Sequence, residues 1–312
     1  MKNKCLIESP GYRELFESGE LHNRMLILKK YYEKCSLCPH QCGANRTNGE
    51  TGVCCSGSRP FVASYTSHYG EEPPISGVCG SGTIFFSRCS GRCIFCQNYP
   101  ISQLGTGKEV TGEFLAEMMV ELQKRGCHNI NLVTPTHFIP SIVSAIFIAA
   151  SKGLCIPIVY NTSGYERVEI LRLLKGIIDI YLPDAKYADN SVAANISGFS
   201  NYTGYNRAAL IEMYNQVGNL KMRDGIAVKG ILVRHLILPN GLSGTDDVMK
   251  FLSESLSRDI YVSLMDQYFP AYKAIDHKQL SHRITLDEYH YAIKSYSHYG
   301  LHNGWIQEHL LI

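Results

Sequence analysis

Three of the chain's cysteines stand close together in the segment FFSRCSGRCIFCQNYPIS (85–102). Cys89, Cys93 and Cys96 are spaced C-x3-C-x2-C, so one short loop can present three thiolates to the same point. A structural zinc site closes with four ligands, and ferredoxin-type [4Fe–4S] clusters also take four cysteines. Three thiolates therefore suit a [4Fe–4S] cluster that leaves one iron open to a small molecule. The alternative is a set of zinc-binding or core cysteines.

A second group of cysteines lies near the start of the chain, in CSLCPHQCGANRTNGETGVCC (35–55). Four thiolates, from Cys35, Cys38, Cys42 and Cys54, could close a zinc site or hold a second iron–sulfur cluster. We expect a metal of one kind or the other here. The choice between zinc and iron–sulfur stays open, and a set of reduced structural cysteines is the competing interpretation.

Composition narrows the class of protein. The chain has 312 residues, 45% of them hydrophobic, and a formal net charge of +2, so it offers no basic surface for nucleic acid or an anionic membrane. The first twenty residues are too polar for a signal peptide, and no later run is apolar enough to span a bilayer. We therefore expect a cytoplasmic protein. Because the cytosol keeps thiols reduced, the 12 cysteines favour metal binding over disulfides.

From about residue 82 onward, short apolar runs alternate with helical patterns, which is typical of βαβ units and a parallel sheet. The runs that fit buried strands are 82–87, 129–133, 155–160, 176–182, 230–238 and 259–265. Six strands with right-handed crossovers form an open barrel, and a closed eight-stranded barrel would need more units. The predicted fold class is therefore α/β: a partial (β/α)6 barrel over 81–312, preceded by an irregular cysteine-rich segment over 1–80.

Charged side chains follow one of these apolar runs directly and interrupt another. In LPDAKY (182–187), Asp184 and Lys186 are two residues apart, so a strand would place both on one face. Arg234 stands inside an otherwise apolar strand, and a buried guanidinium needs an anion, best of all a carboxylate. Because functional sites form at the carboxyl ends of parallel strands, we expect these residues in a binding site. A surface ion pair is the alternative for Asp184 and Lys186.

The C-x3-C-x2-C loop directly after an early strand, with Phe95 just before the last cysteine, resembles the radical S-adenosylmethionine superfamily. The resemblance covers about residues 80–270. It points to the branch similar to the pyruvate formate-lyase activating enzyme, in a form with an added cysteine-rich N-terminal segment.

This resemblance implies a mechanism. A [4Fe–4S] cluster on Cys89, Cys93 and Cys96 binds S-adenosylmethionine at its open iron. An electron from reduced flavodoxin or ferredoxin cleaves the cofactor, and the resulting 5′-deoxyadenosyl radical abstracts a hydrogen atom from the substrate. The implied substrate is a protein or peptide, with a glycyl-radical enzyme as one candidate.

The resemblance also implies a cofactor-binding set. The family's Gly-Gly-Glu motif is absent from VTPTHF (133–138), where Thr134 and Thr136 offer hydroxyls and carbonyls instead; His137 is a ligand, a proton carrier or a packed side chain. Asp184 and Lys186 match the family's Asp-x-Lys, and Arg234 its carboxylate-binding arginine. The remaining implied contacts are Phe95, Asn161, Thr162 and Ser163, with Gln267, Asp266 or Tyr268 near adenine. An N-cap is the alternative for the group at 161–163.

Two other functions compete with this interpretation. The first is radical modification of a small molecule. The second is a non-catalytic iron–sulfur or zinc protein, either a binding module or an electron carrier. An electron carrier has no need of an anion-binding pocket, so Asp184, Lys186 and Arg234 favour an enzyme.

Overall fold

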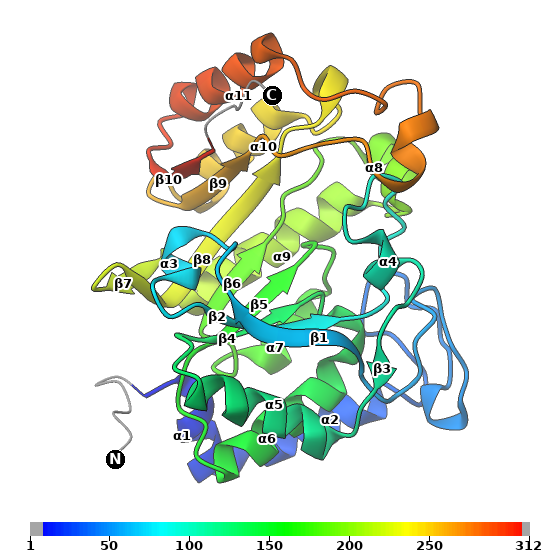
Figure 1. The fold of residues 1–312 in the computed structure, drawn as a ribbon, viewed down its shortest axis with the longest axis vertical. Coiled ribbons are helices and arrows are strands. Elements are labelled where there is room, and N and C mark those ends of the chain that lie inside the picture. The colour runs from blue at the N-terminus through cyan, green and yellow to red at the C-terminus, as the bar shows by residue number, and fades with distance from the viewer. Residues whose placement is uncertain (1–8, 308–312) are drawn as a thin grey trace.

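The computed structural model describes residues 9–307, and one ten-stranded sheet runs through it (Figure 1). The strands are β1 (Phe61–His68), β2 (Ser81–Phe86), β3 (Lys108–Glu109), β4 (Ile130–Val133), β5 (Ile158–Thr162), β6 (Ile180–Pro183), β7 (Lys221–Arg223), β8 (Ile226–Leu236), β9 (Tyr261–Met265) and β10 (Asn303–Ile306). The helices are α1 (Gly11–Glu17), α2 (Glu20–Lys30), α3 (Pro73–Ser76), α4 (Tyr99–Ser102), α5 (Gly112–Lys124), α6 (Ile139–Ser151), α7 (Val168–Leu174), α8 (Asn190–Ser197), α9 (Tyr202–Val217), α10 (Thr245–Phe251) and α11 (Leu286–His298).

The six strands expected from the sequence form the parallel part of this sheet. They lie in the order β2-β4-β5-β6-β8-β9, so each neighbour in space is also the next of these strands along the chain. Helices α5, α6, α7, α9 and α10 occur between successive strands of the series. This is the arrangement of a partial (β/α)6 barrel, and the predicted fold class is confirmed.

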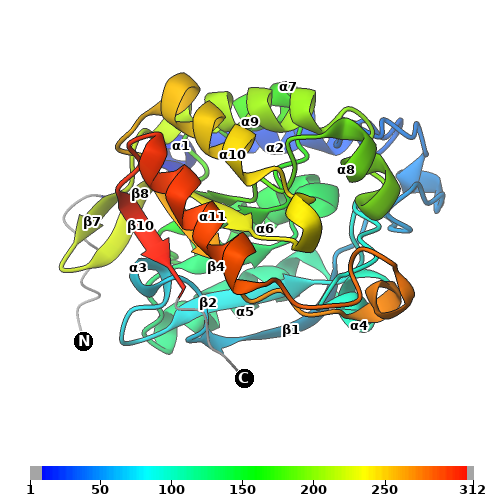
Figure 2. The same cartoon turned by 90° about the horizontal axis from the view of Figure 1, so that it is seen from above.

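The sheet does not close. Beyond β2 it continues with β1, which pairs antiparallel to β2, and then with β3 at the edge. Beyond β9 it continues with β10, which is parallel to β9, while β7 pairs antiparallel to β8 away from the main path. Figure 2 shows α7, α9 and α10 along one side of the molecule and β1 along the other. The other face of the sheet therefore forms a lumen that opens to the side.

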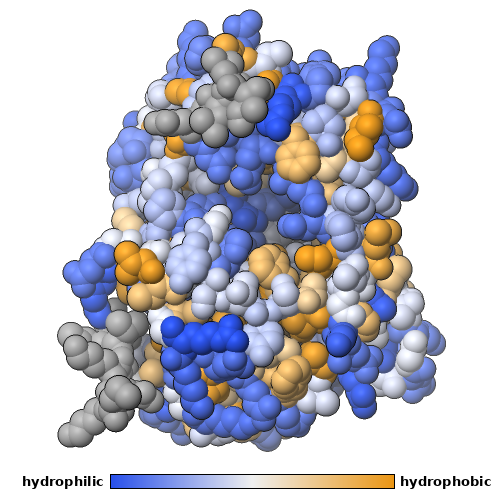
Figure 3. All heavy atoms as spheres, in the orientation of Figure 1, coloured by the Kyte–Doolittle hydropathy of each residue, from blue (hydrophilic) through white to orange (hydrophobic). Residues whose placement is uncertain are grey.

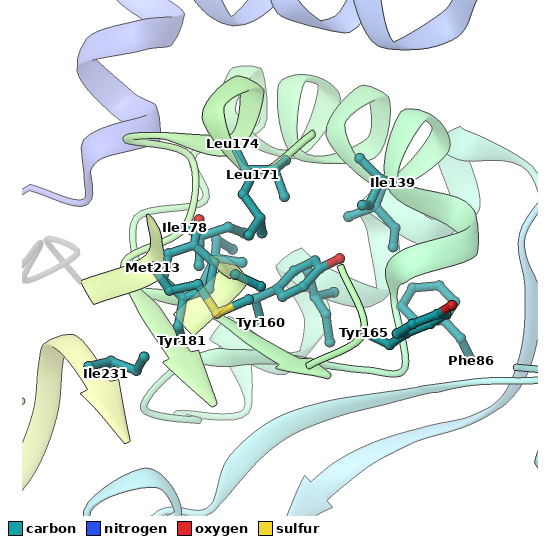
Figure 4. Close-up of a cluster of buried hydrophobic side chains, with 14 of the residues drawn as sticks. Phe86, Ile139, Tyr160, Tyr165, Leu171, Leu174, Ile178, Tyr181, Met213 and Ile231 are labelled. Atoms are coloured by element: carbon teal, nitrogen blue, oxygen red, sulfur yellow. The ribbon is translucent and has the colours of Figure 1, made fainter. Parts of the chain in front are cut away.

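The main core lies between the sheet and its covering helices (Figure 4). Tyr160 and Tyr181, on neighbouring strands, are almost inaccessible to solvent. Their rings pack edge to face, with centroids 6.0 Å apart. Met213 of α9 and Leu171 of α7 are fully buried in the same core. These apolar contacts fix the register of β5 and β6, and with it the positions of the polar residues at their carboxyl ends.

Residues 9–80 are only partly irregular, which corrects the expectation for the described part of this segment; residues 1–8 lie outside the described residues. Helix α2 packs on α6 and α1 packs on α2, while Tyr12, Leu21 and Leu28 are fully buried in the main core. Short helices of this kind owe their stability mostly to tertiary packing, so the local sequence signals them weakly. The irregular part is 31–60, which contains the N-terminal cysteines.

Local signals set some of the helix boundaries. The Thr285 side chain accepts from the Glu288 N–H and the Glu288 carboxylate accepts from the Thr285 N–H, which forms a capping box at the start of α11. The buried face of α5 is mainly apolar, with Leu115, Met118, Met119 and Leu122. Between residues 9 and 307, no helix is both long and apolar enough to cross a membrane.

Candidate radical active site

The cysteine loop (residues 87–98) leaves β2 at its carboxyl end and carries Cys89, Cys93 and Cys96, all free thiols. Gly91 shapes the loop, because a Cβ there would lie 2.6 Å from the Phe199 ring. Burial raises the pKa of Cys89 to about 12, and the neighbouring Cys93 and Cys96 raise this pKa further. The three thiols therefore lie near one another, and iron binding would displace their protons.

Each thiol has a hydrogen-bond donor close by. The Cys89 sulfur accepts from the Gly91 N–H at 3.2 Å, and the Cys93 sulfur accepts from the Ser197 hydroxyl at 2.9 Å. The Cys96 sulfur lies 3.1 Å from Ser102 Oγ. Hydrogen bonds to the sulfurs of an iron–sulfur cluster tune its reduction potential. The donor set therefore fits a cluster with three protein ligands.

A buried charged cluster, formed by Asp184, Lys186 and Arg234, lies at the carboxyl ends of β6 and β8. Lys186 Nζ lies 2.6 Å from Asp184 Oδ2, and Arg234 Nε donates to Asp184 Oδ1 at 2.9 Å. Arg234 Nη2 also donates to Asn161 Oδ1 at 2.7 Å. The structure thus brings these four predicted site residues together, from β5, β6 and β8 and the loops that follow them.

Electrostatics holds the charged cluster ionised despite its burial. Burial opposes the charge on Asp184, but Arg234 and Lys186 outweigh it and keep the pKa of this carboxyl below its ordinary value. Burial acts to lower the pKa of the Lys186 amine, but Asp184 and then Cys93 outweigh it and hold this pKa above its ordinary value. Burial raises the pKa of the Cys93 thiol, and the positive charge of Lys186 partly offsets this rise. This coupling places the charged cluster beside the cysteine loop.

The backbone beneath the charged cluster is tightly packed. Gly164 has a φ of +71°, and a Cβ there would lie 2.2 Å from the Asp184 carbonyl oxygen. That oxygen accepts from the Asn206 amide at 3.0 Å and from the Tyr202 hydroxyl at 3.2 Å. Because glycine alone fits this approach, the loop after β5 is pinned against the end of β6. Tyr202 and Asn206, on α9, carried no motif from which the sequence could have identified them.

Two of the predicted threonines point elsewhere. The Thr136 hydroxyl donates to Glu166 Oε1 at 2.6 Å, and the Thr162 hydroxyl donates to the same oxygen. Burial raises the pKa of Glu166 to about 7. The hydroxyls of Thr136 and Thr162 therefore point to Glu166, whereas the Thr162 carbonyl accepts from the Asp184 N–H at 2.9 Å. Whether either threonine contacts a cofactor stays a prediction. Thr134 is half-buried, with a φ of +59°, at the end of β4.

The other predicted contacts lie around the rim. Phe95 is buried, and its ring packs edge to face against the Tyr268 ring, with centroids 5.9 Å apart. The Gln267 carbonyl accepts from the Gln97 amide at 3.0 Å, which ties the loop after β9 to the cysteine loop. The Ser163 carbonyl accepts from the Tyr202 hydroxyl at 2.9 Å. Whether these residues touch a cofactor stays a prediction.

Both histidines near the site are buried and engaged. His137 Nε2 lies 2.9 Å from the Ser87 carbonyl oxygen, and burial lowers the pKa of this imidazole to about 3. His235 lies 2.6 Å from the Ala185 carbonyl oxygen through Nδ1 and 2.9 Å from Thr245 Oγ1 through Nε2. These contacts match the packing interpretation of His137, and His235 is likewise a buried, hydrogen-bonded side chain.

The thiols of the N-terminal cysteine segment (residues 35–57) also lie near one another. Burial raises the pKa of Cys35, with a further contribution from Cys42, and burial raises the pKa of Cys38 to about 12, with contributions from Cys54 and Cys35. The four predicted ligands are therefore neighbours. Among residues 9–307, however, no three His, Cys, Asp or Glu side chains converge closely enough to ligate one metal ion.

The N-terminal cysteine segment is joined to the cysteine loop by hydrogen bonds. His40 Nε2 lies 2.8 Å from the carbonyl oxygen of Ser90, between the first two loop cysteines. Arg92 donates from Nη2 to Cys55 Sγ at 3.2 Å and from Nη1 to the Cys89 carbonyl at 3.3 Å. The side chain of Arg92 therefore links the two cysteine groups.

Arg46 fastens the same segment to the barrel. This side chain is 1% exposed, and it donates to the Gly57 carbonyl at 3.0 Å and to the His137 carbonyl at 2.6 Å. Its guanidinium also lies over the Tyr32 ring at 4.5 Å. A buried cation is tolerated here because carbonyl oxygens and an aromatic face replace its water.

Comparisons with known proteins agree with the cysteine loop. A model described as "Radical SAM superfamily" matches residues 83–228. Two uncharacterized proteins of Methanocaldococcus jannaschii are similar to the chain. MJ0674 is 30% identical over 336 residues, covering 96% of this chain and 92% of that protein, and MJ0808 is 25% identical, covering 79% and 75%. A solved structure, "Structure of TYW1 with a lysine-pyruvate adduct bound", aligns at a TM-score of 0.44 and 14% identity, covering 69% of this chain and 73% of that one.

We expect Arg46→Met to lower the free energy of unfolding by about 2–5 kcal/mol, because two buried carbonyls lose their donor. Chemical denaturation of the purified protein measures the change. The control is Arg59→Met, whose side chain is 69% exposed and which should shift stability by less than about 0.5 kcal/mol. Equal stability of the two variants would show that Arg46 does not fasten the N-terminal cysteine segment.

Proposed function

The chain belongs to the radical SAM superfamily, and on that premise we propose that it cleaves S-adenosylmethionine reductively and removes a hydrogen atom from a protein or peptide substrate. Membership indicates an enzyme with a [4Fe–4S] cluster and S-adenosylmethionine. The observation that carries the proposal is the position of three free thiols beside the buried charged cluster.

Cys89, Cys93 and Cys96 would hold the cluster, since their sulfurs share one loop and each has a hydrogen-bond donor. When bound, such a cluster supplies the electron that breaks a carbon–sulfur bond of S-adenosylmethionine. The three cysteines are only half-buried in the chain alone, so a bound cofactor and substrate would have to complete the shielding of a reactive radical from water.

The charged cluster would orient the cofactor. Arg234 Nη1 lies 3.8 Å from Glu71 Oε2, beyond hydrogen-bond distance, so this part of the guanidinium can still donate to a carboxylate. Asp184 is held ionised and can accept from an ammonium group. A zwitterionic amino-acid moiety, such as the methionyl end of S-adenosylmethionine, presents both groups. Asn161, already hydrogen-bonded to Arg234, would fix the orientation of the guanidinium.

The finer parts of the proposal concern the substrate, the electron donor and the location. Phe95 before the last cysteine, the Asp184-x-Lys186 pair and Arg234 support an activating-enzyme-like member, for which a glycyl-radical enzyme is the substrate and reduced flavodoxin or ferredoxin the electron donor. The open side of the sheet supports a macromolecular substrate, because a loop of a partner can enter there. A cytoplasmic location belongs to the same proposal.

The proposal includes a second metal on Cys35, Cys38, Cys42 and Cys54. Its support is the mutual proximity of these thiols and their hydrogen-bonded connection to the cysteine loop. A single zinc ion, with bonds of about 2.3 Å to sulfur, would require the thiols to move closer together. An iron–sulfur cluster spans a wider gap between its ligands.

The first test is anaerobic reconstitution with iron and sulfide, followed by dithionite and S-adenosylmethionine. We expect 5′-deoxyadenosine from the wild-type chain and none from Cys93→Ser, because that variant lacks one of the three thiolates. Cys79→Ser, an exposed cysteine away from the loop, should behave as the wild type. A wild-type protein that carries the cluster and yields no 5′-deoxyadenosine would contradict the proposal.

The second test concerns Arg234. Arg234→Gln should weaken the binding of S-adenosylmethionine about 10- to 100-fold, as expected for the loss of a charge-assisted hydrogen bond, and leave the iron content unchanged. Equilibrium binding to the reconstituted protein measures this, with Arg172→Gln, 67% exposed, as the control. If Arg234→Gln bound S-adenosylmethionine as tightly as the wild type, the carboxylate of the cofactor would have to bind elsewhere.

The third test counts metals. Wild-type protein and the double variant Cys35→Ala/Cys38→Ala are analysed for iron and zinc after identical reconstitution. We expect the variant to lose either zinc or part of its iron, because both thiols belong to the N-terminal cysteine segment. Unchanged content of both metals would remove the second site.

A further inference from the structure

A cavity of about 260 Å³, the lumen pocket, lies on the side of Arg234 that faces away from Asp184. It is lined by residues that include Glu71, Glu72, Arg234, Ser263, Gln267 and Trp305. Figure 3 shows the molecule from the side of α3 and β1, with a hollow near the middle of this face. The two glutamates directly precede α3, so the N-terminal region supplies one wall of the pocket.

One acceptor atom in this wall, and a second on a residue that contacts the wall, have no hydrogen-bond donor within the described part of the chain. The Glu71 side chain is 9% exposed, and its Oε1 accepts from Asn131 Nδ2 at 3.0 Å. Among the residues that the structure describes, Glu72 Oε2 and Asn131 Oδ1 are buried without a hydrogen-bond partner. Buried polar atoms are nearly always paired in native proteins. Because these atoms only accept, the missing partner is a hydrogen-bond donor.

The charges around Arg234 do not balance. Three carboxylates, Asp184, Glu71 and Glu72, face two permanent cations, Lys186 and Arg234. The only other basic side chain that acts on Glu71 in the described part of the chain is His68, and histidines are neutral at about pH 8. Burial raises the pKa of Glu71, Arg234 opposes that rise, and Glu72 adds to it. An uncompensated buried carboxylate is unfavourable, so a ligand with one positive charge would stabilise the pocket. The Trp305 ring, half-buried in the same wall, offers a face for an alkyl chain or a cation.

The lumen pocket lies next to the candidate radical site, because Arg234 and Gln267 belong to its lining. Arg234 contacts Asp184 through Nε and faces Glu71 through Nη1, so it stands between the charged cluster and the pocket. On the other side, Gln267 lines the pocket and accepts from Gln97, the residue after Cys96. A molecule in the pocket would therefore lie next to a cofactor held by the charged cluster and the cysteine loop.

We propose that the lumen pocket binds the substrate through a primary alkylammonium group, with Glu72 and Glu71 as its acceptors. This inference rests on the proposed function, because it assigns the chemical class of the molecule that the radical would attack. The cavity is large enough for one lysine-sized side chain or a small amine and too small for a folded loop. Sequence reasoning missed both glutamates, since EEPP (71–74) gave no sign of facing a barrel lumen.

The test is calorimetric titration of the anaerobically reconstituted protein, without reductant, at about pH 8, where histidines are neutral. The probes are n-butylammonium and its neutral isostere n-butanol. We expect n-butylammonium to bind about tenfold more tightly than n-butanol, and Glu72→Gln to abolish that preference. Glu109→Gln, an exposed carboxylate on β3, should keep it. Equal binding of the two probes to the wild type would overturn the inference.

S-adenosylmethionine also carries a net positive charge, so its binding is measured alongside. We expect Glu72→Gln to retain wild-type affinity for S-adenosylmethionine within about twofold. Competition between n-butylammonium and S-adenosylmethionine, or an equal loss of both in the variant, would assign the pocket to the cofactor and overturn the inference.

A third probe, Nα-acetyl-lysine methylamide, distinguishes the source of the amine. Tighter binding than n-butylammonium indicates a lysine side chain, and weaker binding indicates a free amine; both support the inference. Since no electron is supplied, these measurements stand apart from cofactor cleavage. Absence of 5′-deoxyadenosine in the reconstitution test would remove the proposed function and leave the ammonium site intact.

Discussion

The candidate site depends on one shared ion pair: the Asp184 carboxylate contacts both Arg234 and Lys186. Any one of these charges, alone in the interior, would neutralise or draw in water. Together they stay ionised, because each supplies the counter-charge for another. The pair Asp184–Arg234 also marks the place where β6 and β8 end their pairing. One interaction therefore fixes the site electrostatically and positions the strand ends that surround it.

The N-terminal region completes the site and shares its core. Arg46 and His40 connect it to the loops after β4 and β2, and Glu71 reaches Arg234 from the opposite side of the lumen. Buried residues of α1 and α2 belong to the main hydrophobic cluster. The barrel proper supplies thiols and cations, whereas the N-terminal region supplies carboxylates and a second set of thiols. This division explains why the lumen carries excess negative charge beside Arg234.

Much of the fold could be predicted because the six strands from β2 to β9 in the parallel series are mostly buried apolar runs with clear boundaries. The spacing of Cys89, Cys93 and Cys96 and the interruption of β8 by Arg234 likewise predicted which residues meet. Helices α1 and α2 were missed, since their stability comes from packing on distant elements. Strand β10 is only four residues long and has no periodicity to reveal it.

Residues that act through single long-range contacts could not be predicted. Ser197 donates to Cys93 from more than 100 positions away, and Glu71 meets Arg234 across the lumen; neither carries a local pattern. The hydroxyls of Thr136 and Thr162 also have a partner that the sequence does not indicate, because the buried Glu166 accepts from both. Their contact with a cofactor stays a prediction. Only the folded chain shows which polar group a hydroxyl reaches.

The central claim is that three cysteines hold a cluster with an open iron beside a cofactor site built on Asp184. Electron paramagnetic resonance of the reconstituted, dithionite-reduced protein tests it most directly, with spectra recorded before and after S-adenosylmethionine is added. The account predicts that the cofactor shifts the spectrum of the reduced cluster in the wild-type chain. A reduced [4Fe–4S] signal that saturating S-adenosylmethionine leaves unchanged would contradict it.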